Sequence, residues 1–94
     1  MEVIHKNGDR KGLFAVKDED KIVAEMTYVW SGDDNFIIDH TEVNPTYQGK
    51  GLGKAMVEKA VEFARKNNVT ILPLCPFARG VFTREQSYQD VLKK

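Results

Sequence analysis

The spacing of apolar residues changes once along this chain, at the glycine-rich segment 43–54. Before this segment, apolar and polar residues alternate, which is typical of strands with one buried face. After it, apolar residues recur every three or four positions over residues 51–67 and predict an amphipathic helix of about four turns. A short apolar run follows at residues 70–74. A strand, a helix and a second strand form a βαβ unit, so these two strands are expected to be parallel and the fold to be α/β.

The first 43 residues predict four strands. Apolar runs at residues 2–6, 13–16, 21–30 and 36–43 are separated by short segments rich in Asn, Gly and Asp. Such short turns join antiparallel strands, because parallel neighbours need a long crossover. The expected architecture is a mainly antiparallel five-stranded sheet with one parallel pair, one long helix after the glycine-rich segment, and short helices from Pro76 onward.

Length and charge exclude several classes of protein. The 94 residues suffice for a single small domain, spanning residues 1–94, with one hydrophobic core. Fourteen Lys and Arg balance 14 Asp and Glu, so the net charge is zero and neither a nucleic acid nor an anionic membrane is an expected partner. The one cysteine, Cys75, has no internal disulfide partner. This cysteine, and the lack of a signal peptide or membrane-length apolar run, favour a cytoplasmic location.

The glycine-rich segment has the composition of an anion-binding loop. Glycines at positions 49, 51 and 53 alternate with other residues and leave room for a ligand to approach the main chain. The first N–H groups of the following helix have no partner within the helix, and the helix dipole adds partial positive charge there. Lys50 and Lys54 add full charges. These features predict a phosphate or pyrophosphate site, and a tight turn without a ligand is the alternative.

Two common phosphate motifs do not fit this segment. The nucleoside-triphosphate loop needs a glycine, four residues, and then Gly-Lys-Ser/Thr. Here Ala55 follows Gly53-Lys54, and Gln48 stands where the first glycine is required. The dinucleotide fingerprint needs a third glycine three positions after the second. That position is Lys54 or Met56, so this motif fails as well.

A different family does fit. The hexapeptide at residues 48–53, which reads QGKGLG, resembles the acyl-coenzyme A pyrophosphate loop of the GNAT superfamily of N-acetyltransferases, whose pattern is Gln/Arg-x-x-Gly-x-Gly/Ala. The strand that ends in Val43-Asn44-Pro45 and the helix from Leu52 to Phe63 agree with the family too. The resemblance covers roughly residues 12–83 and is strongest over residues 36–75. It implies a minimal GNAT-like fold and an N-acetyltransferase that moves an acetyl group from acetyl-coenzyme A (acetyl-CoA) to an amine.

The resemblance also implies where acetyl-CoA would bind. Main-chain N–H groups of the loop would hold the pyrophosphate, and the pantetheine arm would lie between splayed fourth and fifth strands. An N–H near Val43 would then face the thioester carbonyl and stabilise the oxyanion. Pro73 fits this arrangement, because a strand that leaves its neighbour can spare a hydrogen-bond donor. No metal ion is expected. The residues expected to bind acetyl-CoA are Val43, Gln48, Gly49, Lys50, Gly51, Leu52, Gly53 and Lys54.

The usual catalytic groups of the family are replaced in this chain. Family members often carry a Glu as general base where this chain has Ile37, and a Tyr as general acid where it has Phe82. Cys75 replaces the Asn of the same helix motif. A non-catalytic acyl-CoA-binding sensor or interaction module is therefore the alternative function, and an unliganded structural domain is a third.

Three other residues are candidates for catalysis. His40 and Glu42 lie two apart in a strand and share one face. His40 could take a proton from an incoming ammonium group, and Glu42 could orient His40 or act as the base through a water molecule. The alternative is that they line a solvated face or satisfy each other. Cys75 follows the fifth strand, near the expected thioester, and could protonate the departing thiolate or accept the acetyl group itself. The alternative there is a small buried apolar residue.

The acceptor site is expected to be open. Family members usually have two helices between the first two strands, which help to shape this site, but only a short segment separates those strands here. An open site suits a small-molecule amine or the amine of a protein side chain or terminus. The chain itself is expected to be a monomer or a weak dimer.

Overall fold

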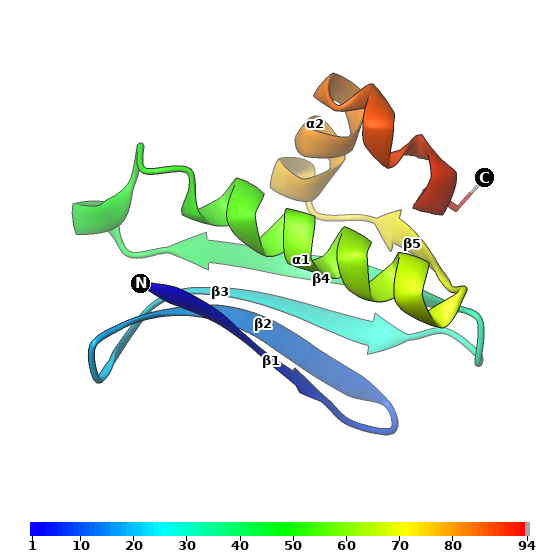
Figure 1. Ribbon diagram of the computed structural model, residues 1–94, viewed down its shortest axis with the longest axis horizontal. Coiled ribbons are helices and arrows are strands. Elements are labelled where there is room, and N and C mark those ends of the chain that lie inside the picture. The colour runs from blue at the N-terminus through cyan, green and yellow to red at the C-terminus, as the bar shows by residue number, and fades with distance from the viewer. Residues whose placement is uncertain (94) are drawn as a thin grey trace.

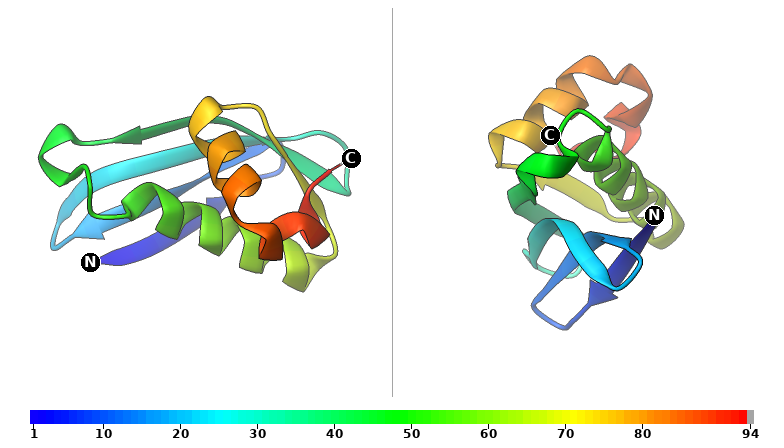
Figure 2. Two further views of the ribbon diagram at one scale, coloured as in Figure 1. Left: turned by 90° about the horizontal axis from the view of Figure 1, so that it is seen from above. Right: turned by 90° about the vertical axis from the view of Figure 1, so that its left-hand side faces the viewer.

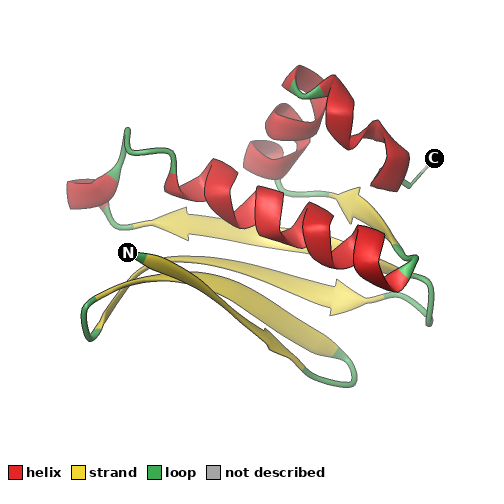
Figure 3. Cartoon of the chain, viewed as in Figure 1, coloured by secondary structure: helices red, strands yellow, loops and turns green. Residues whose placement is uncertain are grey.

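In the computed structural model, which describes residues 1–93, two α-helices lie on one face of a single sheet (Figures 1 and 2). Figure 3 distinguishes the elements by type. The strands are β1 (Glu2–Asn7), β2 (Lys11–Asp18), β3 (Lys21–Trp30), β4 (Asn35–Val43) and β5 (Thr70–Pro73). The α-helices are α1 (Leu52–Asn67) and α2 (Pro76–Arg84), and the 3₁₀ helices are η1 (Pro45–Tyr47) and η2 (Gln86–Val91).

The sheet has the predicted topology. Its strand order is β1-β2-β3-β4-β5; the first three neighbouring pairs are antiparallel, and β4 pairs with β5 in parallel. Helix α1 connects the parallel pair and crosses the face of the sheet (Figure 1). Residues 8–10 alone join β1 to β2, so no helix separates the first two strands. The expectation of a mainly antiparallel five-stranded sheet with one parallel pair is confirmed.

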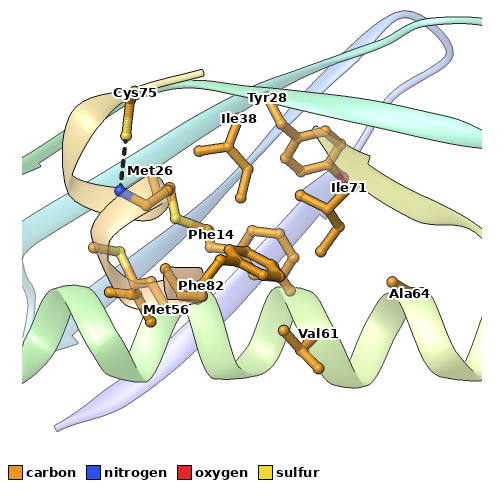
Figure 4. Close-up of a cluster of buried hydrophobic side chains, with 14 of the residues drawn as sticks. Phe14, Met26, Tyr28, Ile38, Met56, Val61, Ala64, Ile71, Cys75 and Phe82 are labelled. Carbon is orange, nitrogen blue, oxygen red and sulfur yellow. Dashed lines mark hydrogen bonds between the residues drawn. The ribbon is translucent and has the colours of Figure 1, made fainter. Parts of the chain in front are cut away.

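One face of α1 is buried against the sheet and α2. Its buried side chains are Leu52, Met56, Val57, Ala60, Val61 and Ala64. They join a core that includes Phe14, Met26 and Ile38 from the strands and Phe82 from α2 (Figure 4). Each fully buried large apolar side chain contributes about 1.5–3 kcal/mol to stability. Asn68 ends the helix in the left-handed conformation, with φ of 56°, and its N–H donates to the carbonyls of Ala64 and Arg65.

Strands β4 and β5 separate after a short ladder. Their pairing ends at Ile38 and Pro73, whereas β4 continues to Val43. Proline has no N–H to donate, and the next two N–H groups, of Leu74 and Cys75, both donate to the carbonyl of Ile38 at 3.0 and 3.1 Å. The chain then turns into α2, which begins at Pro76. The last residues of β4 are thereby left without β5 beside them, as the sequence predicts.

A β-bulge interrupts β4 just before this free edge. Thr27 of β3 pairs with His40 of β4. The next residue, Tyr28, pairs with Ile38, so Asp39 is an extra residue without a partner of its own in the ladder. A bulge of this kind shifts the alternation of side chains along the strand by one residue.

The bulge decides which side chains of β4 face the helices. Thr41 pairs with the buried Met26 and Val43 with Ala24, so both lie on the face that α1 covers. His40 and Glu42 lie on the opposite face and are exposed. Without the extra residue, this assignment of faces would be reversed.

The last described residues cover the outer edge of β5. Leu92 forms a parallel bridge with Ile71, and the N–H of Lys93 donates to the carbonyl of Ile71 at 2.8 Å. Arg65 of α1 holds this segment through an ion pair with Asp90 at 2.8 Å. Among residues 1–93, no helix has both the length and the apolar character needed to cross a bilayer.

Candidate functional site

Two of the three loop glycines are required by backbone conformation. Gly49 has φ of 83° and Gly51 has φ of 76°, values that other residues rarely adopt. A Cβ atom at either position would meet no atom within 4 Å. A side chain at residue 49 or 51 would therefore have room. The left-handed backbone, and not a lack of space, explains why both residues are glycine.

Gly53 has a different role. A Cβ atom at this position would overlap the ring of Phe77, which belongs to the first turn of α2. The sequence interpretation assigned the space at residue 53 to an approaching ligand, but in the structure an aromatic side chain of the same molecule fills it. The absence of a side chain at Gly53 thus allows α2 to pack closely against the start of α1.

A cavity of about 440 Å³ lies between the glycine loop, the end of β4 and the start of α2. Most of the residues predicted to bind acetyl-CoA line it: Val43, Gln48, Gly49, Gly51, Leu52, Gly53 and Lys54. Lys50 is exposed on the loop and is not part of the lining. The sequence interpretation missed Thr41, Tyr47, Phe77 and Arg84, which also line the cavity. They come from three different elements, β4, η1 and α2, so no local motif marks them.

The start of α1 offers main-chain donors to this cavity. Gly51 is the N-cap and supplies no side-chain hydrogen bond, and the first turn contains no acidic residue. The N–H groups of this turn are thus left to solvent or to a ligand, at the positive end of the helix dipole. Lys54 lines the cavity, and its Nζ lies 3.1 Å from a carboxylate oxygen of Glu85. Part of the charge of Lys54 is therefore compensated within the protein.

Tyr47 ties the segment before the glycine loop to the β2–β3 hairpin, which lies at the same end of the sheet. Its hydroxyl donates to Asp18, in the hairpin between β2 and β3, at 2.7 Å. This hydrogen bond to a carboxylate favours the protonated phenol and raises the pKa of Tyr47 above its ordinary value. The side chain of Asn44 accepts from the N–H of Thr46 and caps η1 just before the loop. Both contacts limit the conformations open to the loop.

Cys75 lies at the N-cap of α2, where the chain leaves β5. Its Sγ accepts a hydrogen bond from the N–H of Ala78 at 3.3 Å, drawn as a dashed line in Figure 4. The hydroxyl of Thr41, on the free edge of β4, lies 3.2 Å from the same sulfur. The side chain is 6% exposed and belongs to the margin of the core. Cys75 is thus a partly sequestered thiol beside the cavity, held by hydrogen bonds from two elements.

The structure does not bring the three predicted catalytic residues together. His40 and Glu42 share one face, but this is the face of β4 opposite to Thr41. Within residues 1–93, neither side chain forms a hydrogen bond with Cys75. Phe82, at the position of the family's tyrosine, is 2% exposed, and the centroid of its ring lies 6.0 Å from that of Tyr88. A reaction that used all three predicted residues would therefore combine His40 and Glu42 on one face of β4 with Cys75 on the other face.

A second cavity, of about 630 Å³, lies along the ends of β3 and β4. Its charged lining residues within the described chain are Glu25 and Glu42, which pair directly across the two strands. Thr41, Val43 and Gln48 line both this cavity and the one at the glycine loop. The two cavities therefore adjoin at the edge of β4 that β5 leaves free. In residues 1–93, no three His, Cys, Asp or Glu side chains are grouped so as to hold a metal ion.

Known proteins are similar to this chain in sequence and fold. Residues 13–91 match the family model of the GCN5-related N-acetyl-transferases. A solved structure of a GCN5-like protein from Staphylococcus aureus is similar, with 38% identity and a TM-score of 0.73 over 96% of this chain and 87% of that one. Among curated proteins, none matches this chain at comparable significance.

Two more distant structures share the fold. The ribosomal-protein-S18-alanine N-acetyltransferase from Escherichia coli has 22% identity and a TM-score of 0.68, over 82% of this chain and 52% of that one. A predicted acetyltransferase from Clostridium acetobutylicum, solved with acetyl-CoA, has 16% identity and a TM-score of 0.65, over 81% of this chain and 56% of that one. This chain thus spans little more than half of either protein.

The family assignment depends on the match over most of the chain and on the S. aureus relative, whose identity and coverage are both high. The strand–glycine loop–helix unit and the separation of β4 from β5 lie within the matched region. The resemblance found in the sequence is thereby confirmed. The chain belongs to the GCN5-related N-acetyltransferase family.

Proposed function

We propose that this protein binds acetyl-CoA at the glycine loop and transfers the acetyl group to an amine that approaches from the opposite face of the sheet. The observation that carries this proposal is the pair of adjoining cavities, which share Thr41 and Val43 at the free edge of β4 and Gln48 at the start of the glycine loop. A donor in one cavity and an acceptor in the other would meet at this edge. Proximity of this kind supplies a large part of the rate of a two-substrate reaction.

The first cavity fits the phosphate end of acetyl-CoA. The N–H groups at the start of α1 lack a side-chain cap, and Gly49 and Gly51 leave the main chain open on the solvent side. Arg84 and Lys54 line the cavity and supply positive charge. Gln48, Gly53 and Leu52 complete the lining of the loop, while Lys50 would act from outside it. Beyond the loop, the free edge of β4 near Val43 would receive the pantetheine arm.

The second cavity fits an amine. A primary amine arrives as an ammonium ion at neutral pH, and the facing carboxylates of Glu25 and Glu42 would attract it. Glu42, or His40 on the same face, would then take the proton, directly or through a water molecule. The neutral nitrogen would form a C–N bond to the thioester carbonyl carbon as the C–S bond breaks.

Cys75 is proposed to act on the departing side. Its thiol would donate a proton to the leaving thiolate of coenzyme A and regain one from water. In the alternative route, the Cys75 thiolate accepts the acetyl group first and passes it to the amine. The position of Cys75 beside Thr41, on the donor side of β4, supports a role next to the thioester in either route. Trapping of an acetylated Cys75 by mass spectrometry would distinguish the two.

Calorimetric titration tests the donor site. Acetyl-CoA and coenzyme A should bind saturably and adenosine triphosphate should not, because the loop lacks the triphosphate motif. Gly51→Glu, which places a carboxylate at the start of α1, should abolish binding of both coenzymes. Glu2→Gln, on β1 away from both cavities, is the matched control and should bind normally. No heat with millimolar coenzyme A and an unchanged melting temperature would contradict the proposal.

A series of acceptors tests the amine site. 1,4-Diaminobutane, 4-aminobutanol and 4-aminobutyrate have the same reacting amine but differ in the charge of the far end. The facing carboxylates predict that kcat/KM falls in this order. Glu25→Gln should reduce the preference for the diamine and leave coenzyme A binding unchanged. Equal use of all three amines would contradict an acidic acceptor site.

A binding module without catalysis is the second candidate function. The observation that favours it is the burial of Phe82 where the family often has a catalytic tyrosine, together with the separation of His40 from Cys75. In that case acetyl-CoA would bind in the titration, but no acetyl transfer to any of the three amines would exceed the rate without protein.

A further inference from the structure

Thr41 and Cys75 form a side-chain contact across the point where β4 and β5 separate. The main-chain ladder between these strands ends at Ile38 and Pro73, but the Thr41 hydroxyl lies 3.2 Å from Cys75 Sγ beyond that end. The bulge at Asp39 makes this contact geometrically available, because it places Thr41 on the face that carries α2. In a regular strand, the side chain of residue 41 would lie on the opposite face.

The two hydrogen-bond neighbours of the sulfur have different chemistry. The N–H of Ala78 is a donor only, so it donates to Sγ in every protonation state. The hydroxyl of Thr41 is a donor and an acceptor. It can accept from the thiol S–H, and it can donate to the sulfur when the thiol is ionised. The ionised sulfur would then have two donors, one from the start of α2 and one from β4.

No ionic partner competes for this sulfur. Within residues 1–93, the hydrogen bonds of Cys75 Sγ are those with Thr41 and Ala78, and no ion pair reaches it. Arg79 of α2 donates instead to the carbonyl of Leu74 at 3.1 Å. The other charged or titratable groups of these elements form no hydrogen bond with the sulfur. They are Lys54, Glu58, Lys59, Glu62, Arg65 and Lys66 of α1, Arg84 of α2, Glu85 after it, and Asp39, His40 and Glu42 of β4.

We propose that Thr41 is a positioning residue for Cys75, whose hydroxyl orients the thiol toward the edge of β4 and stabilises its ionised form by donating to Sγ. Thr41 also lines both cavities, so the group that positions the thiol lies where the donor and the acceptor would meet. The catalytic meaning of this role rests on the proposed function, but the contact itself can be tested without acetyl transfer.

The test uses the fact that Cys75 is the only cysteine of the chain. Alkylation by iodoacetamide, followed by intact mass from pH 6 to pH 10, reports on this thiol alone. Thr41→Val removes the hydroxyl with little change of shape, whereas Thr41→Ser keeps it. A hydrogen bond to an ionised group is strong enough that Thr41→Val should alkylate roughly tenfold more slowly than wild type at neutral pH. Its rate should reach the wild-type plateau at high pH, and Thr41→Ser should follow the wild-type curve.

Two outcomes would overturn the proposal. One is a Thr41→Val curve that coincides with the wild-type curve. The other is a change of rate by the same factor at every pH, which indicates altered access to the thiol rather than altered ionisation. Thr41→Ala lacks the hydroxyl as well and serves if Thr41→Val does not fold. If acetyl-CoA does not bind, the proposed function is refuted. The alkylation curves do not depend on acetyl-CoA, so they test the role of Thr41 separately.

Discussion

The ring of Phe77 occupies the space in which a side chain at residue 53 would lie. This contact joins the first turn of α2 to the first turn of α1, and both residues line the cavity at the glycine loop. Phe77 is 41% exposed although it is large and apolar, so its other side faces the cavity or solvent. The width of the cavity at the glycine loop is therefore set partly by an aromatic side chain that packs on a glycine.

Gly53→Ala should destabilise the protein by about 1–3 kcal/mol, because the added methyl group forces Phe77 out of its position. Urea unfolding measures this change in the free energy of unfolding. In the Phe77→Ala background the same substitution should cost far less, since the space is then free. Equal costs in both backgrounds would show that the contact does not determine the choice of glycine.

Gly51→Ala tests the loop conformation rather than its packing. Nothing lies within 4 Å of the added methyl group, so the cost comes from the left-handed backbone and should be roughly 1 kcal/mol. Gly51→Asn should cost less, because asparagine adopts this conformation more easily. Unfolding and coenzyme A titration should rank the variants in the same order. A tighter complex with Gly51→Ala would contradict the required left-handed conformation.

Glu85→Gln should strengthen the binding of coenzyme A. It removes the carboxylate that lies 3.1 Å from Lys54 Nζ and leaves the full charge of Lys54 available to a phosphate group. Because the pair is exposed, a gain of about two- to fivefold in affinity is expected, and it should shrink as salt is raised. Titrations at two salt concentrations measure this, with Glu62→Gln as a control from an ion pair on the far part of α1. Weaker binding by Glu85→Gln would indicate that the pair positions Lys54 instead.

Stability should fall as the pH drops below about 6.5, because of His5. Its ring stacks on Phe14 with centroids 4.0 Å apart, and its Nε2 lies 2.6 Å from the Tyr28 hydroxyl. Burial lowers the pKa of His5, so the unfolded chain takes up a proton at a higher pH than the folded one. The stabilising effect of the neutral ring is complete above the ordinary pKa and is lost toward lower pH.

Urea unfolding between pH 7.5 and pH 5.5 checks this expectation. His5→Gln should flatten the dependence of stability on pH over this range, whereas His40→Gln, on the exposed face of β4, should retain it. A slope that persists in His5→Gln and disappears in His40→Gln would assign the effect to the other histidine.

Much of the fold could be predicted from local patterns. The change from alternating to helical spacing located α1, and the short polar turns required antiparallel β1 to β4. The glycine loop and its place between a strand and a helix identified the family, since both are encoded by consecutive residues. Of the residues predicted to bind acetyl-CoA, all except Lys50 line the cavity at the glycine loop, and their role in binding stays a prediction.

The rest of the site depends on contacts between distant segments. Thr41 lines the cavity because the bulge in β4 changes the face on which its side chain lies, and Phe77 and Arg84 line it because α2 packs against α1. Neither feature has a local signal in the sequence. Spacing alone placed His40 and Glu42 on one face, but it could not say that Cys75 lies on the other side of the strand.

The sequence by itself thus determined the order of the elements, their pairing and the position of the glycine loop, because periodicity and glycine conformation act over a few neighbouring residues. Only the tertiary structure decided which side chains meet at the free edge of β4. The register with β3 makes Asp39 an extra residue, Pro73 ends the ladder with β5, and the packing of α2 brings Cys75 to Thr41. The bulge, the end of the ladder and the position of α2 each depend on contacts between residues far apart in the chain, and the total free energy of these contacts selects the arrangement.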